Sequence, residues 1–348
     1  MLSSEQLRRS AQSEGLDLVG AVPVGPSPFW HAYETWVEAG HAAGMGYLTR
    51  PDAIWRRQDP RHIMPETQTV LVVAASYAGA PPPAPAPLHG NVSRYAWGPL
   101  GLRSGEDYHT WLLARLRSLV ARIKAELRIS GPTRAYVDTG PILERAWAQA
   151  AGLGWAGKNT NLIHPRLGSY LFLGVALLPV ALPPSIPVPS LPSCGSCTRC
   201  IEACPTGAII APNVVDARRC LSYLTIEHRG EIPEAYRAPM GTRLFGCDTC
   251  QEVCPWNQRP LAAHSSAPAP EMATLYLPDL LTLDAAAFRA RFRHTPIWRA
   301  TPEGLARNAA IVLGNLGDPA ARPALIEAAA HHPSGLVREH AAWALTRV

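Results

Sequence analysis

Hydrophobic and polar positions in the first half of the chain switch between strand-like and helical periods. Residues 69–75 form an almost continuous, valine-rich apolar run, which predicts a strand buried on both faces. Apolar positions recur at helical spacing over residues 107–127 and predict a long amphipathic helix. Shorter segments continue the alternation, with helices expected at 4–14 and 29–39 and strands at 16–22, 134–137 and 170–178. Strands interleaved with helices in this way predict an α/β sandwich domain.

The C-terminal pattern is helical and repeats itself. The positions Leu305, Ala309, Ala310 and Leu313 recur with the same spacing as Val337, Ala341, Ala342 and Leu345. The turn-forming sequence Gly317-Asp318-Pro319 separates the two segments. Paired helices with small residues at the contact predict a short HEAT-like helical repeat. The alternative is a plain helical cap on the preceding domain.

Two proline-rich stretches divide the chain. Residues 179–193 contain 6 prolines, and a second such stretch covers 262–270. Proline-rich segments act as semi-rigid spacers between domains. We therefore predict three domains, at 1–182, 183–262 and 263–348.

The 8 cysteines lie in the middle domain and carry its chemistry. One run, C-x2-C-x2-C-x3-C-P, extends from Cys194 to Pro205, and a second, C-x2-C-x3-C-P, from Cys247 to Pro255. In bacterial-type ferredoxins with this spacing, the cysteine before the proline ligates the other 4Fe–4S cluster. The predicted ligands are Cys194, Cys197, Cys200 and Cys254 for cluster one, and Cys204, Cys220, Cys247 and Cys250 for cluster two. Structural zinc and disulfides are the alternatives, but zinc sites do not predict the paired C-x3-C-P endings and disulfides fit poorly without a secretory signal.

Composition limits the class of protein without identifying a partner. The chain has 348 residues, 47% of them hydrophobic, and a net charge of +5, which is compatible with an anionic partner. Arg8-Arg9 is followed by polar residues, not by the apolar segment of a twin-arginine export signal. The longest apolar run, 170–178, is too short to span a membrane. We expect a cytoplasmic protein with no membrane contact.

Two motifs for small-molecule cofactors fail in the N-terminal domain. No G-x-G-x-x-G follows a predicted strand, so a Rossmann nucleotide site is not supported. Asp107-x-His109 resembles the start of a D-x-H-x-x-G motif that gives cobalt a histidine ligand. Leu112 stands where its glycine should be, and the segment is predicted to be helical, so that interpretation is rejected.

Several longer strings resemble the epoxyqueuosine reductase family. They are residues 138–145, 152–160, 221–230, 246–257 and 307–311, and the resemblance runs from about Gly44 to the C-terminus. One departure is a longer link at 98–105, between Ser93-Arg94-Tyr95 and Asp107-Tyr108-His109.

The resemblance implies an α+β multidomain enzyme that reduces the epoxide of epoxyqueuosine, in the anticodon loop of a tRNA, to queuosine. It implies a cobalamin-binding N-terminal domain similar to that of reductive dehalogenases, with no protein ligand to cobalt. Co(I) cobalamin would be fed by the two 4Fe–4S clusters, whose potentials can be several hundred millivolts negative. An external low-potential electron donor is needed, and we expect a monomer.

The resemblance also suggests roles for individual residues. Asp138, which ends a predicted strand before Gly140-Pro141, would be the proton donor, and burial beside the corrin would raise its pKa. The alternative is that Asp138 caps the next helix. The expected cofactor-binding residues are Arg57, Tyr95, Asp138, Lys158, Asn159, His164, Ser222, Asp248 and Thr249. Lys158 could equally lie in a solvated loop, and His164 could be purely structural.

Arginines gather before and inside the helical repeat. They are Arg289, Arg291, Arg293, Arg299 and Arg307, interleaved with Phe292 and Trp298. Such a set could form a phosphate track for RNA or an ordinary solvated helix face. Two other classes remain: a reductive dehalogenase-like reductase, disfavoured by the missing export signal, and a pure electron-transfer ferredoxin, which would leave the large N-terminal domain without a purpose.

Overall fold

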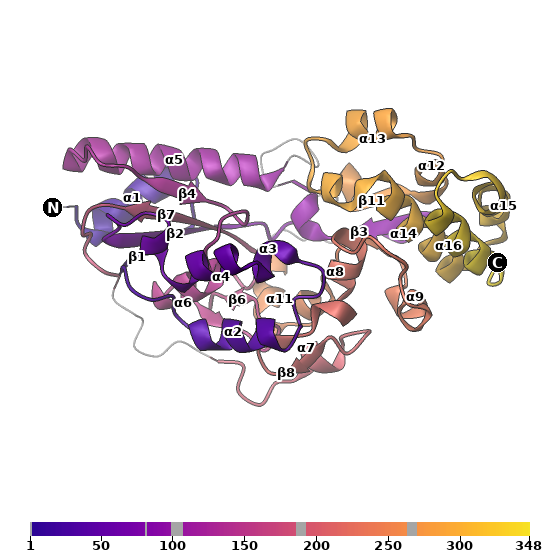
Figure 1. The fold of residues 1–348 in the computed structure, drawn as a ribbon, viewed down its shortest axis with the longest axis horizontal. Coiled ribbons are helices and arrows are strands. Elements are labelled where there is room, and N and C mark those ends of the chain that lie inside the picture. Colours follow the sequence, from indigo (N-terminus) through magenta and orange to yellow (C-terminus); the bar gives the residue numbers. More distant parts are fainter. Residues whose placement is uncertain (1, 81, 99–106, 186–192, 263–269) are drawn as a thin grey trace.

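The computed structural model describes residues 2–80, 82–98, 107–185, 193–262 and 270–348. Residues 186–192 of the first predicted linker, most of the second, and all of the 98–105 link except Gly98 lie outside these residues. The molecule is elongated, with the N-terminal α/β part at one end and the C-terminal helices at the other (Figure 1). Within the described part, no helix is both long and apolar enough to cross a membrane.

A four-stranded antiparallel sheet forms the N-terminal part. Its strands, in spatial order, are β1 (Leu18–Pro23), β2 (Thr69–Ser76), β7 (Leu171–Leu178) and β4 (Arg134–Tyr136). Leu71 and Val73 of β2 face one core, while Val70 and Val72 face a second core that includes Trp147. Both faces of β2 are therefore covered, which confirms the predicted doubly buried strand.

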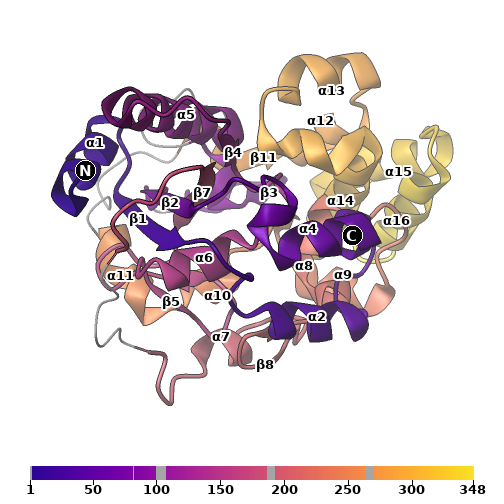
Figure 2. The same ribbon diagram turned by 60° about the vertical axis from the view of Figure 1, so that its left-hand side comes forward.

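Helices cover the two faces of this sheet. Helix α5 (Tyr108–Leu127) lies along one face and α6 (Glu144–Ala150) lies against the other (Figure 2). Gly174 of β7 lets α5 approach, because a Cβ there would lie 3.1 Å from Leu116. The remaining helical elements of this part are α1 (Ser4–Ser13), α2 (Trp30–Glu38), α3 (Gly46–Thr49), α4 (Pro51–Gln58), η1 (Pro60–His62) and η2 (Arg94–Ala96). The long helix at 107–127 is confirmed, and so is the short one at 4–14, which Ser3 caps.

The cysteine-containing segment has short elements. They are α7 (Arg199–Glu202), β8 (Ile209–Ala211), β9 (Val214–Val215), η3 (Ala217–Arg219), α8 (Leu221–Ile226), α9 (Glu234–Met240), β10 (Arg243–Phe245), α10 (Thr249–Glu252) and α11 (Pro255–Ala262). It packs on the N-terminal part through the small β5–β6 hairpin (Trp155–Ala156 and Leu162–Ile163), where Trp155 contacts Trp256 edge-on.

A second sheet joins all three predicted domains. Strand β3 (His89–Val92) pairs in parallel with β10 and antiparallel with β11 (Thr274–Tyr276). The three ranges therefore share one sheet, which the sequence did not indicate. The boundaries at 182/183 and 262/263 remain predictions.

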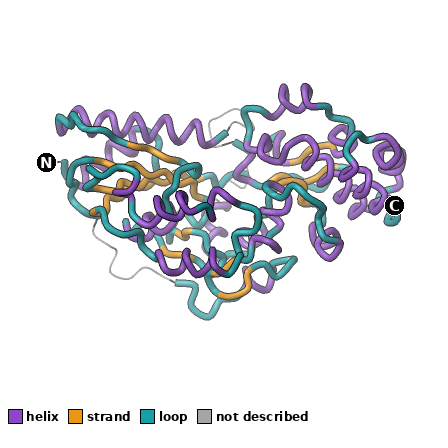
Figure 3. Tube along the Cα trace, viewed as in Figure 1, coloured by secondary structure: helices purple, strands orange, loops and turns teal. Residues whose placement is uncertain are grey.

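The C-terminal part is helical, as Figure 3 shows. Its elements are η4 (Glu271–Ala273), α12 (Leu277–Leu281), α13 (Ala285–Phe292), η5 (Pro296–Ala300), α14 (Thr301–Leu316), η6 (Pro319–Ala321), α15 (Arg322–His331) and α16 (Gly335–Leu345). Helix α14 is buried from Gly304 to Gly314 and crosses α16 closely, since a Cβ on Gly314 would lie 2.8 Å from Ala344. Gly317 ends α14 in the left-handed conformation, and the helix stops where the sequence predicted the separation of the two helices.

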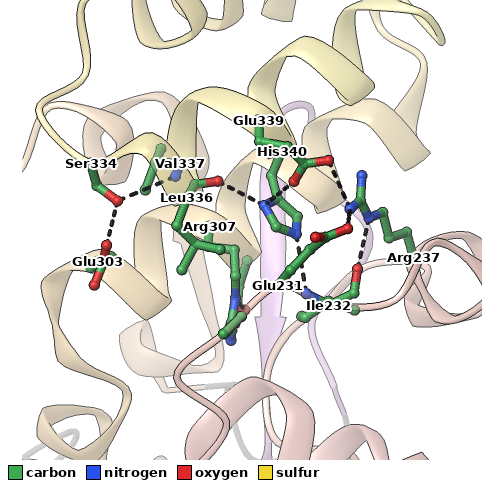
Figure 4. A network of polar contacts seen from close by, with 12 residues as sticks. Glu231, Ile232, Arg237, Glu303, Arg307, Ser334, Leu336, Val337, Glu339 and His340 are labelled. Atoms are coloured by element: carbon green, nitrogen blue, oxygen red, sulfur yellow. Dashed lines mark hydrogen bonds and ion pairs between the residues drawn. The ribbon is translucent and has the colours of Figure 1, made fainter.

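A buried polar network joins α16 to the segment after α8 (Figure 4). His340 is fully buried; its Nδ1–H donates to Leu336 O at 2.7 Å, and its Nε2 accepts from the Ile232 N–H at 3.2 Å. Arg237 pairs with Glu231 at 2.7 Å and with Glu339 at 2.9 Å. Protonating His340 would set an Nε2–H against the Ile232 N–H, so the network requires the neutral ring.

This network predicts a loss of stability in acid. Burial lowers the pKa of His340 to about 4, and the charges of Arg237 and Arg307 act in the same direction. An unfolded histidine has a pKa of about 6.5, so the unfolded state binds more protons between pH 6.5 and 4, and stability falls as pH drops through this window. Denaturant unfolding at pH 7.5 and pH 5 should show His340 contributing about 2 kcal/mol to the difference. His340→Gln should lack that share; an identical pH dependence in this variant would contradict the assignment.

Candidate functional site

The first cysteine set lines one pocket. The residues around it are Lys158, Asn159, Ile163, Cys194, Cys197, Arg199, Cys200, Cys254, Pro255 and Trp256. Burial raises the pKa of the Cys200 thiol, and Cys194, Cys254 and Cys197 are close enough to raise it further. The structure thus brings together the four cysteines predicted for cluster one.

The second set converges although Cys220 lies outside both compact runs. The turn η3 and the start of α8 bring Cys220 close to Cys247 and Cys204, whose charges raise its pKa beyond the effect of burial. Cys247 and Cys220 act in the same way on Cys250. All eight cysteines lie in the described residues as free thiols, so the disulfide alternative is not supported. Among the described side chains, no group of three or more His, Cys, Asp or Glu could hold a single metal ion.

Asp138 follows β4 in a left-handed backbone conformation, with φ of +57°. Its side chain is 51% exposed, and Oδ2 lies 3.2 Å from His109 Nε2 and accepts a hydrogen bond from Arg299 Nη1 at 3.2 Å. It does not cap a helix, because α6 begins at Glu144 and its N-cap is Leu143, without a side-chain cap. The helix-cap alternative for Asp138 is therefore wrong.

His109 connects Asp138 to two other charged groups. Its Nδ1 lies 2.5 Å from Asp107 Oδ1, and its Nε2 lies 2.8 Å from Arg299 Nη2. Both ring nitrogens thus face protein groups, in agreement with rejecting His109 as a cobalt ligand. The Asp107-x-His109 pair was the only signal in the sequence for this residue. Nothing in the sequence linked Asp107 or His109 to Asp138 or to Arg299.

The pKa of Asp138 is shifted in the direction opposite to expectation. Partial burial raises it, but the hydrogen bond with His109 and the charges of Arg299 and Arg145 lower it more, so the pKa lies well below the ordinary value. Burial lowers the pKa of His109, but hydrogen bonds with Asp107 and Asp138 outweigh burial and leave it above the ordinary value. The expected raised pKa of Asp138 is thus wrong: in this pair the imidazole has the raised pKa and the carboxyl has the lowered one.

Aromatic rings and one buried acid surround Asp138. Its charge adds to burial in raising the pKa of Tyr47, to about 12, and it likewise raises those of Tyr95 and Tyr108. Glu144 Oε1 is buried and has no hydrogen-bond partner among the described residues. Burial, followed by the Asp138 charge, raises the pKa of Glu144 to about 8, so this carboxyl is mostly protonated at neutral pH.

Three of the residues predicted to bind the cofactor contact protein loops. The buried Arg57 donates to Tyr47 O at 3.0 Å, to Ala53 O at 3.2 Å and, at 3.5 Å, to the carbonyl of Gly140 in the loop after Asp138. Lys158 Nζ donates to Gly195 O at 2.8 Å, and Asn159 Nδ2 donates to Cys250 O at 3.2 Å. Lys158 and Asn159 therefore fasten the N-terminal part to both cysteine runs.

Other predicted residues lie beside the second cysteine set. Asp248 is held by the Arg94 N–H at 2.6 Å, and burial raises its pKa to about 6. Thr249 Oγ1 accepts from Arg243 Nη2 at 2.8 Å and from Cys247 Sγ at 3.4 Å. Ser222 is half-buried, two residues after Cys220.

Tyr95 and His164, the remaining residues predicted to bind the cofactor, lie in different surroundings. Tyr95 packs edge-on against Tyr108, and the charges of Arg299 and Asp138 both act on its hydroxyl. His164 Nδ1 accepts from the N–H groups of Arg166 and Leu167, each at 3.2 Å, and its segment forms a β-bridge with Gly168. These contacts agree with the alternative that His164 is purely structural.

The arginine-rich segment is not a single track. Arg307 is fully buried and donates to Gly230 O at 2.6 Å and Leu224 O at 2.8 Å, and Phe292 is also in the core. The exposed members are Arg289, Arg291, Arg293 and Trp298. Because Arg307 and Phe292 are buried and Arg299 contacts Asp138, the seven residues form neither one continuous phosphate track nor one solvated helix face.

Sequence profiles identify the cluster and repeat segments. A 4Fe-4S double cluster binding domain matches residues 193–257, and HEAT repeats match residues 297–348, which confirms both predictions. Together with the N-terminal α/β part, these matches define an iron–sulfur protein with a C-terminal helical repeat. The profile described as epoxyqueuosine reductase QueG, DUF1730, matches residues 57–139.

Relatives that align over most of this chain identify its family. The epoxyqueuosine reductase of Xanthomonas campestris is 39% identical to this chain over 99% of its length and 96% of the relative. That of Pseudomonas aeruginosa is 39% identical over 90% of this chain and 86% of the relative. The chain belongs to the epoxyqueuosine reductase family.

Solved structures of the family share the fold. The enzyme from Streptococcus thermophilus superposes with a TM-score of 0.87 at 28% identity, over 100% of this chain and 90% of that one. An epoxyqueuosine reductase bound to an epoxyqueuosine-modified tRNA stem loop gives 0.84 at 31% identity, over 99% and 89%. The Bacillus subtilis enzyme, captured with an aspartate catalytic loop swung out of its active site, gives 0.83 at 30%, over 99% and 89%. A reductive dehalogenase reaches only 0.40 at 15%, so the expected likeness to that class remains a prediction.

Proposed function

We propose that this protein reduces the epoxide of epoxyqueuosine, in the anticodon loop of a tRNA, to the cyclopentene of queuosine. The reaction takes up two electrons and two protons, breaks both C–O bonds and releases the oxygen as water. The main observation behind this proposal is the Asp138–His109 pair, a half-exposed carboxylate next to an imidazole with a raised pKa. The same chain brings together two sets of four cysteines. The relative bound to a modified stem loop supports the substrate, and the catalytic aspartate loop of the Bacillus subtilis enzyme supports the role of Asp138.

The residues around Asp138 fit cobalamin as the cofactor. Cobalamin would supply a strongly reducing cobalt centre for opening the epoxide. The Glu144 carboxyl, whose Oε1 has no hydrogen-bond partner among the described residues and which is mostly protonated at neutral pH, can donate a hydrogen bond to an amide carbonyl on the corrin rim. Tyr47, which is 45% exposed, offers a ring for apolar contact. Arg57 would act indirectly, by holding Gly140 in the loop that follows Asp138.

Protons reach the leaving oxygen from this chain. His109 holds a proton that it passes to Asp138, and Asp138 presents it at the half-exposed carboxyl. A general acid placed in this way typically contributes about 10²–10⁴ in rate.

Electrons arrive through the two cysteine sets, one at a time. The Cys200 charge reaches Cys250 strongly enough to affect its pKa, so the two sets are neighbours. Asn159 ties the N-terminal part to the Cys250 carbonyl and gives the second set a fixed place near the substrate site. An external low-potential donor loads the clusters. We further propose that the protein is monomeric and acts in the cytoplasm.

The exposed arginines and Trp298 would meet the RNA. Arg289, Arg291 and Arg293 can pair with phosphates, while Trp298 is 41% exposed and packs one side against Phe288 at 5.4 Å between ring centroids. An aromatic ring held in this way can stack on a splayed loop base.

One assay tests the proposed function. The protein, purified without air and loaded with iron, sulfide and cobalamin, is given a chemical reductant and a stem-loop RNA that carries epoxyqueuosine. Mass spectrometry should show the loss of one oxygen atom from the modified base. Conversion of a halogenated aromatic with no change in the RNA would support the dehalogenase class instead. Iron–sulfur absorption without corrin binding or turnover would support the ferredoxin class.

A further inference from the structure

Nε2 of His109 faces two groups with opposite requirements. Arg299 Nη2 lies 2.8 Å away and can only donate a hydrogen bond, while Asp138 Oδ2 lies 3.2 Å away and, when ionised, can only accept one. A single imidazole nitrogen either carries a proton and donates a hydrogen bond, or lacks the proton and accepts a hydrogen bond. The cluster therefore has two arrangements that exclude each other.

In the first arrangement His109 is neutral. Its Nδ1–H donates to Asp107, its Nε2 accepts from Arg299 Nη2, and Asp138 accepts from Arg299 Nη1. In the second, His109 is an imidazolium that donates from Nδ1 to Asp107 and from Nε2 to Asp138. The Arg299 guanidinium must then leave, because its N–H would face another N–H at 2.8 Å and two positive charges would adjoin.

Arg299 is able to make this movement. Its carbonyl is held by Arg229 Nη2 at 2.7 Å, so the backbone of η5 stays fixed, while 34% of the side chain is exposed. It follows the exposed Trp298 directly and belongs to the same part as the exposed Arg291 and Arg293. An RNA lying on this surface would bring phosphates to the guanidinium, which binds them in a bidentate manner.

We propose that Arg299 is a positioning residue that couples RNA docking to proton loading: a phosphate draws the guanidinium away, and His109 then takes a proton from solvent and donates it to Asp138. This inference rests on the proposed function. The proton is one of the two that epoxide reduction consumes, and no further oxidant or reductant is needed. Without RNA, the positive charge of Arg299 opposes protonation of His109, so RNA docking increases the fraction of the ring that carries the proton.

The charges around His109 agree with this coupling. Those acting on His109 itself are Asp107, the N-cap of α5, Asp138 after β4 and Arg299 of η5. Tyr95 of η2, Tyr108 of α5 and Arg145 of α6 act on the same cluster. Among the main contributions to the pKa of His109, the two carboxylates raise it, whereas Arg299 and burial lower it. Moving the guanidinium away removes the opposing positive charge.

The test follows the protonation of His109 by NMR. The oxidised holoprotein is labelled in its 12 histidines, and the His109 signal is identified by its absence in His109→Gln. Without RNA, Arg299→Gln should raise the pKa of His109 by about one unit, the size expected on losing an adjacent like charge. A stem-loop RNA carrying epoxyqueuosine should raise it by a similar amount in the wild-type protein and by only a few tenths in Arg299→Gln.

Arg322→Gln is the matched control, because it removes one positive charge from the C-terminal part at an exposed position outside the proposed RNA surface. Its His109 pKa without RNA should equal the wild-type value. If Arg299→Gln loses iron, Arg299→Lys is used in its place. Without RNA, the pKa of His109 in Arg299→Lys should lie between the wild-type value and the value expected when the guanidinium is absent. An unchanged pKa in the Arg299 variant, or an equal RNA-induced rise with and without Arg299, would overturn the coupling. If the wild-type protein reduces the epoxide but RNA does not change the pKa of His109, only the coupling is wrong. If the epoxide is not reduced at all, the proposed function is wrong.

Discussion

Cys220→Ala is expected to leave about four of about eight irons per chain and to abolish reduction of the modified RNA. The structure brings Cys220 next to Cys204 and Cys247, so its removal leaves the second 4Fe–4S site with three thiolates. Iron and acid-labile sulfide analysis, with the absorption spectrum, measure the loss. Ser196→Ala is the control, since Ser196 is exposed between Cys194 and Cys197 and should keep all the iron. A Cys220→Ala protein with full iron content and full turnover would contradict the ligand assignment.

The same variant separates electron delivery from cofactor binding. Asp138, Glu144 and Tyr47 belong to the N-terminal part, so cobalamin should still bind Cys220→Ala with an affinity within a few-fold of wild type. Loss of turnover with cobalamin binding intact is the expected pattern. Equal loss of both would mean that the second cluster also builds the cofactor pocket.

The parts of the fold that were predicted correctly depend on local pattern. The doubly buried β2, the long helix α5 and the repeat at α14–α16 each extend over enough residues for their period to be read. The β3–β10–β11 sheet was missed because its strands have only three or four residues and come from distant parts of the chain. No local signal indicates such pairings.

The same distinction holds for the site. Spacing within short runs, with one cysteine left over, predicts two groups of four cysteines, and the structure brings members of each group close together. His109 and Arg299 were not linked because 190 residues separate them, and only the folded chain brings the guanidinium to the imidazole. The error in the pKa of Asp138 has the same origin: the hydrogen bond with His109 and the charges of Arg299 and Arg145 outweigh the burial that was expected to dominate.

Arg307 shows why charge alone did not identify the RNA surface. Its guanidinium donates to the carbonyls of Leu224, His228 and Gly230, and it is fully buried. Burial lowers its pKa to about 10, which leaves it charged at neutral pH. An arginine that anchors α14 to the end of α8 looks, in sequence, the same as one that binds phosphate.

Asp138→Asn is expected to reduce the rate of epoxide reduction by about two orders of magnitude, the lower end of the usual contribution of a placed general acid. The amide keeps the size of the side chain and can still accept from Arg299, so RNA and cobalamin should bind nearly as in wild type. It lacks the negative charge that favours a proton on His109, and it cannot relay that proton to the leaving oxygen.

The measurement is a single turnover on stem-loop RNA with chemical reductant in excess, so that electron delivery does not limit the rate. In the wild type the rate should fall as pH rises through the elevated pKa of His109, because the protonated ring is the active form. Asp138→Asn should show a low rate at every pH, and His109→Gln should resemble it, with the double variant little worse than either single one because the two residues act as a unit. Asp52→Asn, which changes an exposed carboxylate in the same part of the chain, should react at the wild-type rate. Near-normal conversion by Asp138→Asn, or a double variant in which the two losses multiply, would show that Asp138 and His109 do not form the proton-donating pair.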